Sequence, residues 1–228
     1  MYTNTNEKYE YSYQNSAVSH HHAYIISALM EMISEAAAVL ENKQKPRILD
    51  IGCGNGSLTN LIAQHGYEVV GVEESASGVQ LAQDTFPNCK FIQGSIYNLP
   101  YAKIGDNFDI VIAAEVIEHL FFPRELVVNA QKCLKPNGRL IVTTPYHGYL
   151  KNLILAVSGK MDKHFAALWD GGHIKFFSVA TMTNLLKSEG CTDIKFKFAG
   201  RLPYVWKSML CSSVIADGAT NKAKNKTV

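Results

Sequence analysis

The sequence lacks three features that would assign its class directly: a long apolar run, a cysteine framework and an excess of one charge. No stretch is apolar for long enough to cross a bilayer, and no basic-then-apolar secretory leader begins the chain. The cysteines are odd in number (5) and contain no C-x-x-C pair, which argues against disulfides. A net charge of +2 over 228 residues gives no field for gathering nucleic acid. We expect a cytoplasmic protein with reduced thiols, and the charge does not favour a nucleic-acid partner.

Apolar strand-like runs alternate with helical stretches along most of the chain. The strands are expected near residues 47–51, 68–73, 90–94, 108–114 and 138–144. This alternation predicts a parallel sheet with helices on both faces. Runs near 192–199 and 207–216 predict an antiparallel pair that completes the sheet. The fold class is therefore α/β: a single Rossmann-like, doubly wound, seven-stranded sheet, mostly parallel with a C-terminal antiparallel strand.

The remaining segments suggest a flap, a lid and a tail around this sheet. Residues 1–44 predict an N-terminal flap and a helix from Tyr24 to about Asn42, with His20 to His22 as a polar entrance to the helix rather than a metal site. The domain proper spans 45–216, and 146–172 is an irregular stretch rich in aromatics and histidines, which favours a lid. Residues 217–228 are expected to be a disordered tail.

A glycine-rich turn follows the first strand, in the segment Arg47-Ile-Leu-Asp-Ile-Gly-Cys-Gly-Asn-Gly56. Its spacing is G-x-G-x-G, and Ser57 stands where a dinucleotide fingerprint needs its third glycine. Asp50 places a negative charge in the turn, which would repel a diphosphate and attract an ammonium group. A ligand with an amino-acid end and no phosphate fits this turn best.

The second strand also ends in an acid, Glu73, about twenty residues further on. A carboxylate at that place can accept both ribose hydroxyl hydrogens of an adenosine. S-adenosylmethionine has both of these parts, a ribose and an amino-acid end, and it has no phosphate. Each of Asp50 and Glu73 taken alone could be an ordinary strand-end acid that caps the next helix, but the two together around this turn favour the cofactor.

The run ILDIGCGNGSLTNLIAQHGYEVVGVEES resembles the first two motifs of class I S-adenosylmethionine-dependent methyltransferases, and the similarity extends from about Arg47 to about Ala216. The resemblance implies that the glycine turn holds the methionine part, that Asp50 orients its amino group and that Glu73 binds the ribose. Ser95 stands where the family often has an aspartate for the adenine amino group, and a turn serine is the alternative reading. The implied cofactor residues are Asp50, Gly52, Cys53, Gly54, Gly56, Glu73, Glu74, Ser95, Ile96 and Ala114.

The chemistry of methyl transfer should lie at the end of the fourth strand, at Glu115-Val-Ile-Glu-His-Leu120. If a helix begins at once, Glu115, Glu118 and His119 share one face and form a partial site for Mg²⁺, Mn²⁺ or Zn²⁺. Without a metal, His119 is the expected general base, with Glu115 beside it. The alternative is that these residues only form a wall of the active site.

The hexapeptide is similar to the metal-ligand segment of ubiquinone-pathway O-methyltransferases and to the E-x-x-E-H element of small-RNA 3′-end 2′-O-methyltransferases. In the second family a later histidine completes the site, a part that His173 could take; packing against the sheet is the alternative for it. Tyr146 and His147 are further candidates for contact with the substrate. We expect methylation of a small-molecule hydroxyl, then RNA 2′-O-methylation, then a cofactor-binding module without catalysis.

Overall fold

The computed structural model describes residues 11–16, 24–40, 45–202 and 206–215. The expectations for His20 to His22, for the domain boundary at residue 44 and for the tail from Asp217 lie outside these residues.

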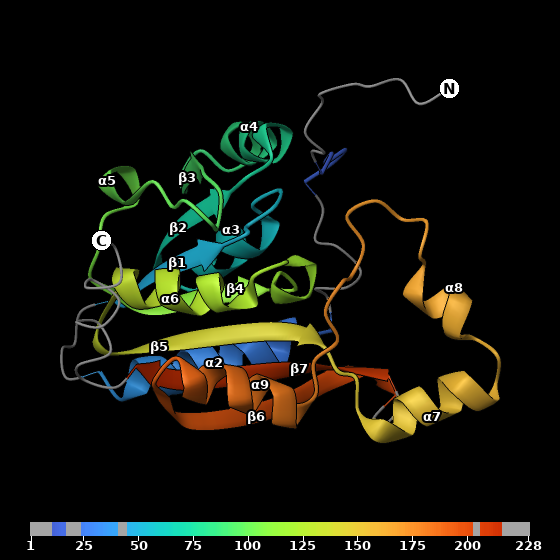
Figure 1. Cartoon of the computed structure of the whole chain (residues 1–228). Coiled ribbons are helices and arrows are strands. Elements are labelled where there is room, and N and C mark those ends of the chain that lie inside the picture. The colour runs from blue at the N-terminus through green and yellow to red at the C-terminus, as the bar shows by residue number, and fades with distance from the viewer. Residues whose placement is uncertain (1–10, 17–23, 41–44, 203–205, 216–228) are drawn as a thin grey trace.

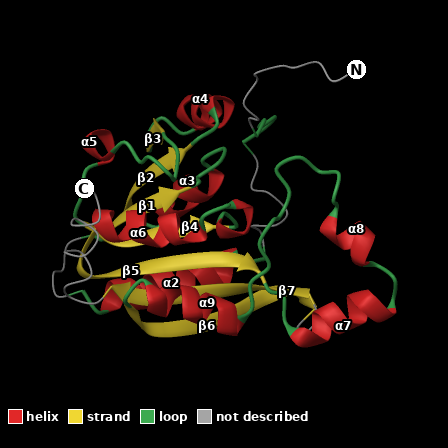
Figure 2. Cartoon of the chain, viewed as in Figure 1, coloured by secondary structure: helices red, strands yellow, loops and turns green. Residues whose placement is uncertain are grey.

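Seven strands form one sheet in the order β3-β2-β1-β4-β5-β7-β6 (Figures 1 and 2). Strand β7 runs antiparallel to β5 and β6, while the pairs among β1 to β5 are parallel. The predicted fold class is confirmed. The strands are β1 (Arg47–Ile51), β2 (Glu68–Glu73), β3 (Lys90–Gln93), β4 (Phe108–Ala114), β5 (Leu134–Pro145), β6 (Cys191–Leu202) and β7 (Trp206–Ile215).

Helices cover both faces of this sheet, because its central strands are apolar on both sides. All seven residues of β4 are buried. Helices α2 (Ile26–Ala38) and α3 (Ser57–Gln64) bury Leu29, Ile33 and Ile62 on one face. Helices α6 (Pro123–Cys133) and α9 (Val179–Ser188) pack on the other face, where Figure 1 shows them in front of the strands. Helices α4 (Ala76–Thr85) and α5 (Tyr101–Ile104) flank the β2–β3 edge.

Two predictions about the secondary structure were wrong. Strand β5 begins at Leu134 instead of near 138, because Leu134 already pairs with Phe108. The register is irregular between Phe108 and Ile110, and the Lys-Pro-Asn-Gly segment supplies the extra residues there. The stretch 146–172 is not irregular throughout. It contains α7 (Tyr149–Val157) and α8 (Met161–Phe165), which project from the sheet in Figure 1.

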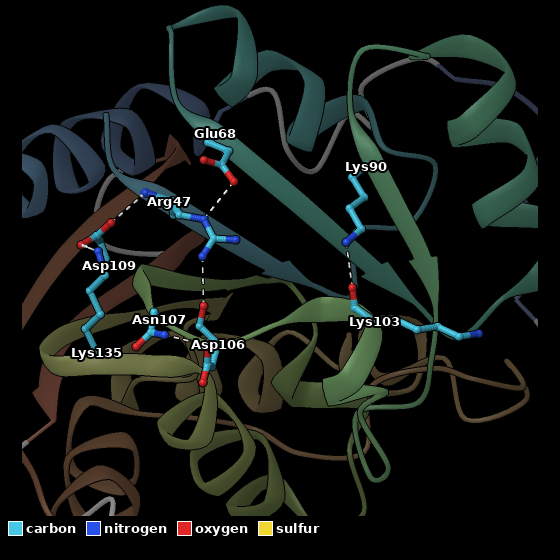
Figure 3. A network of polar contacts seen from close by, with 8 residues as sticks. All are labelled: Arg47, Glu68, Lys90, Lys103, Asp106, Asn107, Asp109 and Lys135. Atoms are coloured by element: carbon cyan, nitrogen blue, oxygen red, sulfur yellow. Dashed lines mark hydrogen bonds and ion pairs between the residues drawn. The ribbon is translucent and has the colours of Figure 1, made fainter. Parts of the chain in front are cut away.

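The amino edge of the sheet, where the parallel strands begin, holds a network of paired charges (Figure 3). The Arg47 guanidinium donates to Glu68 at 2.8 Å and to the Asp106 carbonyl at 3.0 Å. Asp109 accepts from the Arg47 backbone N–H at 2.8 Å and from Lys135 Nζ at 2.7 Å. Charged groups at this edge therefore satisfy one another and tie β1, β2 and β4 together.

All five cysteines are free thiols. Among the described residues no helix is both long enough and apolar enough to cross a membrane.

Candidate active site

The glycine turn joins β1 to α3 at the carboxyl edge of the sheet. Gly52 and Gly54 have φ values of +78° and +56°, a region that favours glycine. A Cβ at Gly52 would lie 2.5 Å from Val116 Cγ2, so this position also has no room for a side chain. The N–H groups of Gly52 and Cys53 both donate to the Val72 carbonyl, at 2.7 and 3.0 Å. The turn is thereby held close to the end of β2, as the spacing predicted.

Asp50 lies beneath this turn with 1% of its surface exposed. Burial raises the pKa of its carboxyl to about 7, although the Thr59 hydroxyl, which donates to Oδ2 at 2.6 Å, acts in the opposite direction. A buried carboxylate gains from a cation brought by a ligand. Cys53, by contrast, packs its thiol against the Phe91 cluster, so its backbone is the part available to a cofactor.

Glu73 ends β2 and is held by the turn. Its Oε2 accepts from the Gly54 N–H and its Oε1 from the Ser75 N–H, both at 2.9 Å. Burial raises the pKa of Glu73, while these two hydrogen bonds act to lower it. The carboxylate is thus fixed in position before any ligand arrives, with lone pairs remaining for hydroxyl donors.

The remaining residues of the implied cofactor set follow or end three neighbouring strands: Glu74 follows β2, Ser95 and Ile96 follow β3, and Ala114 ends β4. Ser95 Oγ donates to Glu74 Oε2 at 3.2 Å. Ile96 is partly buried against the core, and its carbonyl accepts from Asn129 at 2.7 Å. Ala114, the last residue of β4, is 5% exposed.

Residues 11–16 lie across the glycine turn. The Tyr11 carbonyl accepts from Ser75 Oγ at 2.7 Å, and the Asn15 carbonyl accepts from Asn55 Nδ2 at 2.8 Å. The Tyr13 ring fills the space beside Gly54, where a Cβ would lie 2.9 Å from its hydroxyl oxygen.

The expected helix does not begin at Glu115. This residue has φ +56°, and the helical geometry between Glu115 and Leu120 is a short 3₁₀ turn, η1 (Ile117–His119). The predicted helical face shared by Glu115, Glu118 and His119 is therefore not formed. Its Oε1 accepts from Thr143 Oγ1 at 2.8 Å, and burial raises its pKa to about 7.

A different set of residues comes together here. The ligating atoms of Glu118, His119 and His173 all lie within 4.8 Å of one another. Glu118 is 1% exposed, and neither of its carboxylate oxygens accepts a hydrogen bond from a described residue. Burial, followed by the neighbouring Glu115, raises the pKa of Glu118 well above its ordinary value. A carboxylate left buried in this way costs free energy unless a cation or donor joins it.

The two imidazoles are oriented by their surroundings. His119 Nδ1 lies 2.8 Å from the Gly171 carbonyl, which can only accept, so Nδ1 carries the proton and Nε2 the lone pair. His173 Nε2 lies 4.0 Å from Glu118 Oε1. The N–H groups of Ile174 and Lys175 donate to the Glu118 carbonyl, both at 2.9 Å, which ties the end of the lid to η1.

The lid brings His147 to the site, with 7% of its surface exposed. Its ring lies 4.8 Å from Phe176 and 5.4 Å from His164, and burial lowers its pKa to about 4. Tyr146 turns the other way and stacks edge-on against Phe198 of β6, at 5.3 Å. Of these two candidates, His147 is the one placed among the lid aromatics.

Sequence reasoning missed two residues near this site. The hydroxyls of Tyr24 and Ser208 form a hydrogen bond of 2.9 Å. Burial, together with the charges of Glu115 and Glu118, raises the pKa of Tyr24. Lys151 on α7 is only 3% exposed. The sequence did carry a signal for it, because Lys151 is the one charged residue in a mostly apolar helix.

Comparisons with known proteins assign the chain to a family. The methyltransferase domain family matches residues 20–195. Two ubiquinone biosynthesis O-methyltransferases are similar: the mitochondrial protein of Schizosaccharomyces pombe, 29% identical over 63% of this chain, and that of Azorhizobium caulinodans, 31% identical over 60%. The alignments cover 54% of each relative, so the chain spans about half their length.

The fold also matches a solved structure, the magnesium protoporphyrin IX methyltransferase of Synechocystis PCC 6803 with bound SAH. The TM-score is 0.64 at 20% identity, and the match covers 90% of this chain and 91% of that one. The family match, which takes in the glycine turn and both strand-end acids, settles the family. The chain belongs to the class I S-adenosylmethionine-dependent methyltransferases.

Proposed function

We propose that this chain transfers the methyl group of S-adenosylmethionine to a hydroxyl oxygen of a small molecule. The names of the similar relatives support an oxygen acceptor. The observation that carries the proposal is Glu118, a buried carboxylate that accepts no hydrogen bond from a described residue and lies close to two imidazoles, just after the strand that borders the cofactor turn. Such a group of side chains suits an acceptor that must lose a proton.

The cofactor residues divide its binding into three parts. Asp50 and the glycine turn are proposed to hold the amino-acid end, and Glu73 the ribose. Glu74, Ser95 and Ile96 are proposed to surround the adenine. Methyl transfer is an in-line displacement at carbon, so the acceptor oxygen must approach opposite the sulfur. The side chains beyond β4 then orient the acceptor and take its proton.

The residues present fit a divalent cation, although with a different ligand set from the one predicted. We propose Glu118, His119 and His173 as its ligands, with Glu115 outside the set. An unpaired buried carboxylate and an imidazole whose Nδ1 is already bound to a carbonyl are typical of metal ligands. When bound, the cation would supply Lewis acidity toward the acceptor oxygen. Without it, His119 Nε2 can accept the proton.

The other two functions have less support. RNA 2′-O-methylation would use the same histidine, but a net charge of +2 offers little attraction for phosphates. A module without catalysis would not need an unpaired carboxylate beside the cofactor turn. The cytoplasmic location stays a prediction, and one of the similar relatives is named as mitochondrial.

The test is methyl transfer from S-adenosylmethionine to a panel of catechols, with and without a chelator. Glu118→Gln keeps the shape of the side chain and is expected to lower the rate about 100-fold or more. Glu125→Gln, on the exposed side of α6, is the matched control and should leave the rate unchanged. If the rate of methyl transfer is unchanged both by the chelator and by Glu118→Gln, the reaction needs no metal and His119 is the base. A wild-type enzyme that is inactive on every hydroxyl acceptor would contradict the proposed reaction.

A further inference from the structure

A large aromatic side chain lies partly in water beside the candidate metal ligands. Trp169, in the part of the lid that follows α8, has 48% of its surface exposed. The centre of its ring lies 6.4 Å from that of His119 and 6.0 Å from that of His173. An indole has a large apolar surface, and leaving much of it in water forfeits the free energy that burial would give. A ligand that covers this ring would recover that free energy.

The turn that carries Trp169 also orients His119. The Trp169 N–H donates to the Ala166 carbonyl at 2.9 Å, and the Gly172 N–H donates to the Trp169 carbonyl at 3.0 Å. Gly171 has φ +76°, a region that favours glycine, and its carbonyl is the one that lies 2.8 Å from His119 Nδ1. One short turn therefore fixes the positions of both the imidazole and the indole.

The same turn separates the indole from its neighbour in the sequence. A Cβ at Gly172 would lie 3.2 Å from Trp169 Cε3 and 3.0 Å from the Trp169 carbonyl oxygen, so a glycine leaves the space that the ring uses. Leu168, by contrast, is 99% exposed. The turn thus holds the indole beside the imidazoles and leaves the leucine in water.

An acceptor bound by its hydroxyl would bring its other atoms close to this indole. The rings of His119 and His173 lie 4.7 Å apart, and their ligating atoms lie within 4.8 Å of those of Glu118. Aromatic pairs in proteins have ring centres about 4.5 to 7 Å apart, which is the range that separates Trp169 from both imidazoles. The ring of an aromatic acceptor whose hydroxyl lies at this cluster can therefore contact the indole.

We infer that Trp169 is a specificity-determining residue whose indole contacts the ring of an aromatic acceptor, while the hydroxyl of that acceptor lies at the Glu118 cluster; this rests on the proposed function. The aromatic ring takes no part in the bonds that form and break. Its contact with Trp169 is therefore equally strong before and during methyl transfer. Such a contact lowers KM and leaves kcat unchanged, and it grows with the aromatic surface of the acceptor.

The kinetic experiment compares two acceptors, catechol and 2,3-dihydroxynaphthalene, whose second ring presents a larger aromatic face. Trp169→Leu is expected to raise KM about tenfold for catechol and about threefold more for 2,3-dihydroxynaphthalene, with kcat unchanged. Trp169→Phe should recover most of the loss. The control Leu168→Ala, at the exposed neighbouring position, should match the wild type. An unchanged KM, or an equal loss on both acceptors, would overturn the assignment.

Fluorescence gives a second measurement that keeps Trp169 in place. The chain has two tryptophans, so Trp206→Phe leaves Trp169 as the only source of tryptophan emission. With S-adenosylhomocysteine present, saturating catechol should lower the quenching of this emission by acrylamide about twofold, because its ring covers the indole. Unchanged quenching would overturn the inference. If the wild type methylates neither acceptor, the proposed function fails for catechols, while the quenching result still decides whether a catechol ring covers Trp169.

Discussion

The two edges of the sheet use charged residues in opposite ways. At the amino edge Arg47, Glu68, Asp109 and Lys135 meet in direct contacts of 2.7 to 2.8 Å and remain partly open to water. At the carboxyl edge Asp50, Glu73 and Glu118 are buried, and Glu118 accepts no hydrogen bond from a described residue. Paired charges near water cost little and add modest stability, whereas unpaired buried charges cost stability. The comparison indicates that the carboxyl edge is shaped for ligands and the amino edge for the fold.

The largest stability effect is expected from Asp50→Asn in the protein without cofactor. The folded pKa of Asp50, about 7, lies above its ordinary value of 3.8, so the folded state binds a proton more tightly. This stabilisation is present at low pH and is lost as the pH rises through 7. Asp50→Asn should therefore stabilise the protein by roughly 4 kcal/mol near pH 8 and by little near pH 4, measured by urea unfolding. A loss of stability at pH 8 would contradict the contrast between the edges.

A smaller effect of opposite pH dependence is expected at His147. Its folded pKa, about 4, lies below the ordinary 6.5, so the unfolded chain takes up a proton that the folded state does not. Stability from this group is full above 6.5 and falls as the pH drops toward 4. His147→Phe should add about 2 kcal/mol at pH 5 and little at pH 8. An unchanged difference between the two pH values would show that the lid leaves His147 open to water.

The smallest effect is expected at the amino edge. Arg47→Met removes the contacts to Glu68 and Asp106, and the guanidinium that lies 4.7 Å from the centre of the Phe108 ring. It should lower the free energy of unfolding by about 1 to 2 kcal/mol. Affinity for S-adenosylmethionine, measured by calorimetry, should stay the same. A weaker affinity in this variant would mean that the two edges are coupled and not separate in role.

The sequence predicted the fold well because the signals for it are local. The alternation of apolar runs indicated each strand, and the spacing of Gly52, Gly54 and Asp50 indicated the turn and its cofactor. Helix α9 begins with a local signal of the same kind, a capping box at Ser178. The strand order decides which side chains meet in the interior of the sheet. The alternation of strands and helices along the sequence largely determines that order.

The acceptor end could not be predicted as fully, because its geometry depends on contacts between distant segments. The left-handed backbone of Glu115 broke the expected i, i+3, i+4 face, and no residue type near it signals that conformation. His173 meets Glu118 only because the lid returns to η1 through backbone hydrogen bonds. Lys151 was overlooked since a single lysine in an apolar stretch usually points to water.

Titration of the protein with S-adenosylmethionine by calorimetry tests the central claim most directly. The account predicts saturable binding to the wild type and to Arg47→Met, and none to the double variant Asp50→Ala with Glu73→Ala. Circular dichroism and thermal unfolding should show that the double variant is folded. Undiminished binding in the folded double variant would contradict the claim that the buried acids of the carboxyl edge hold the cofactor.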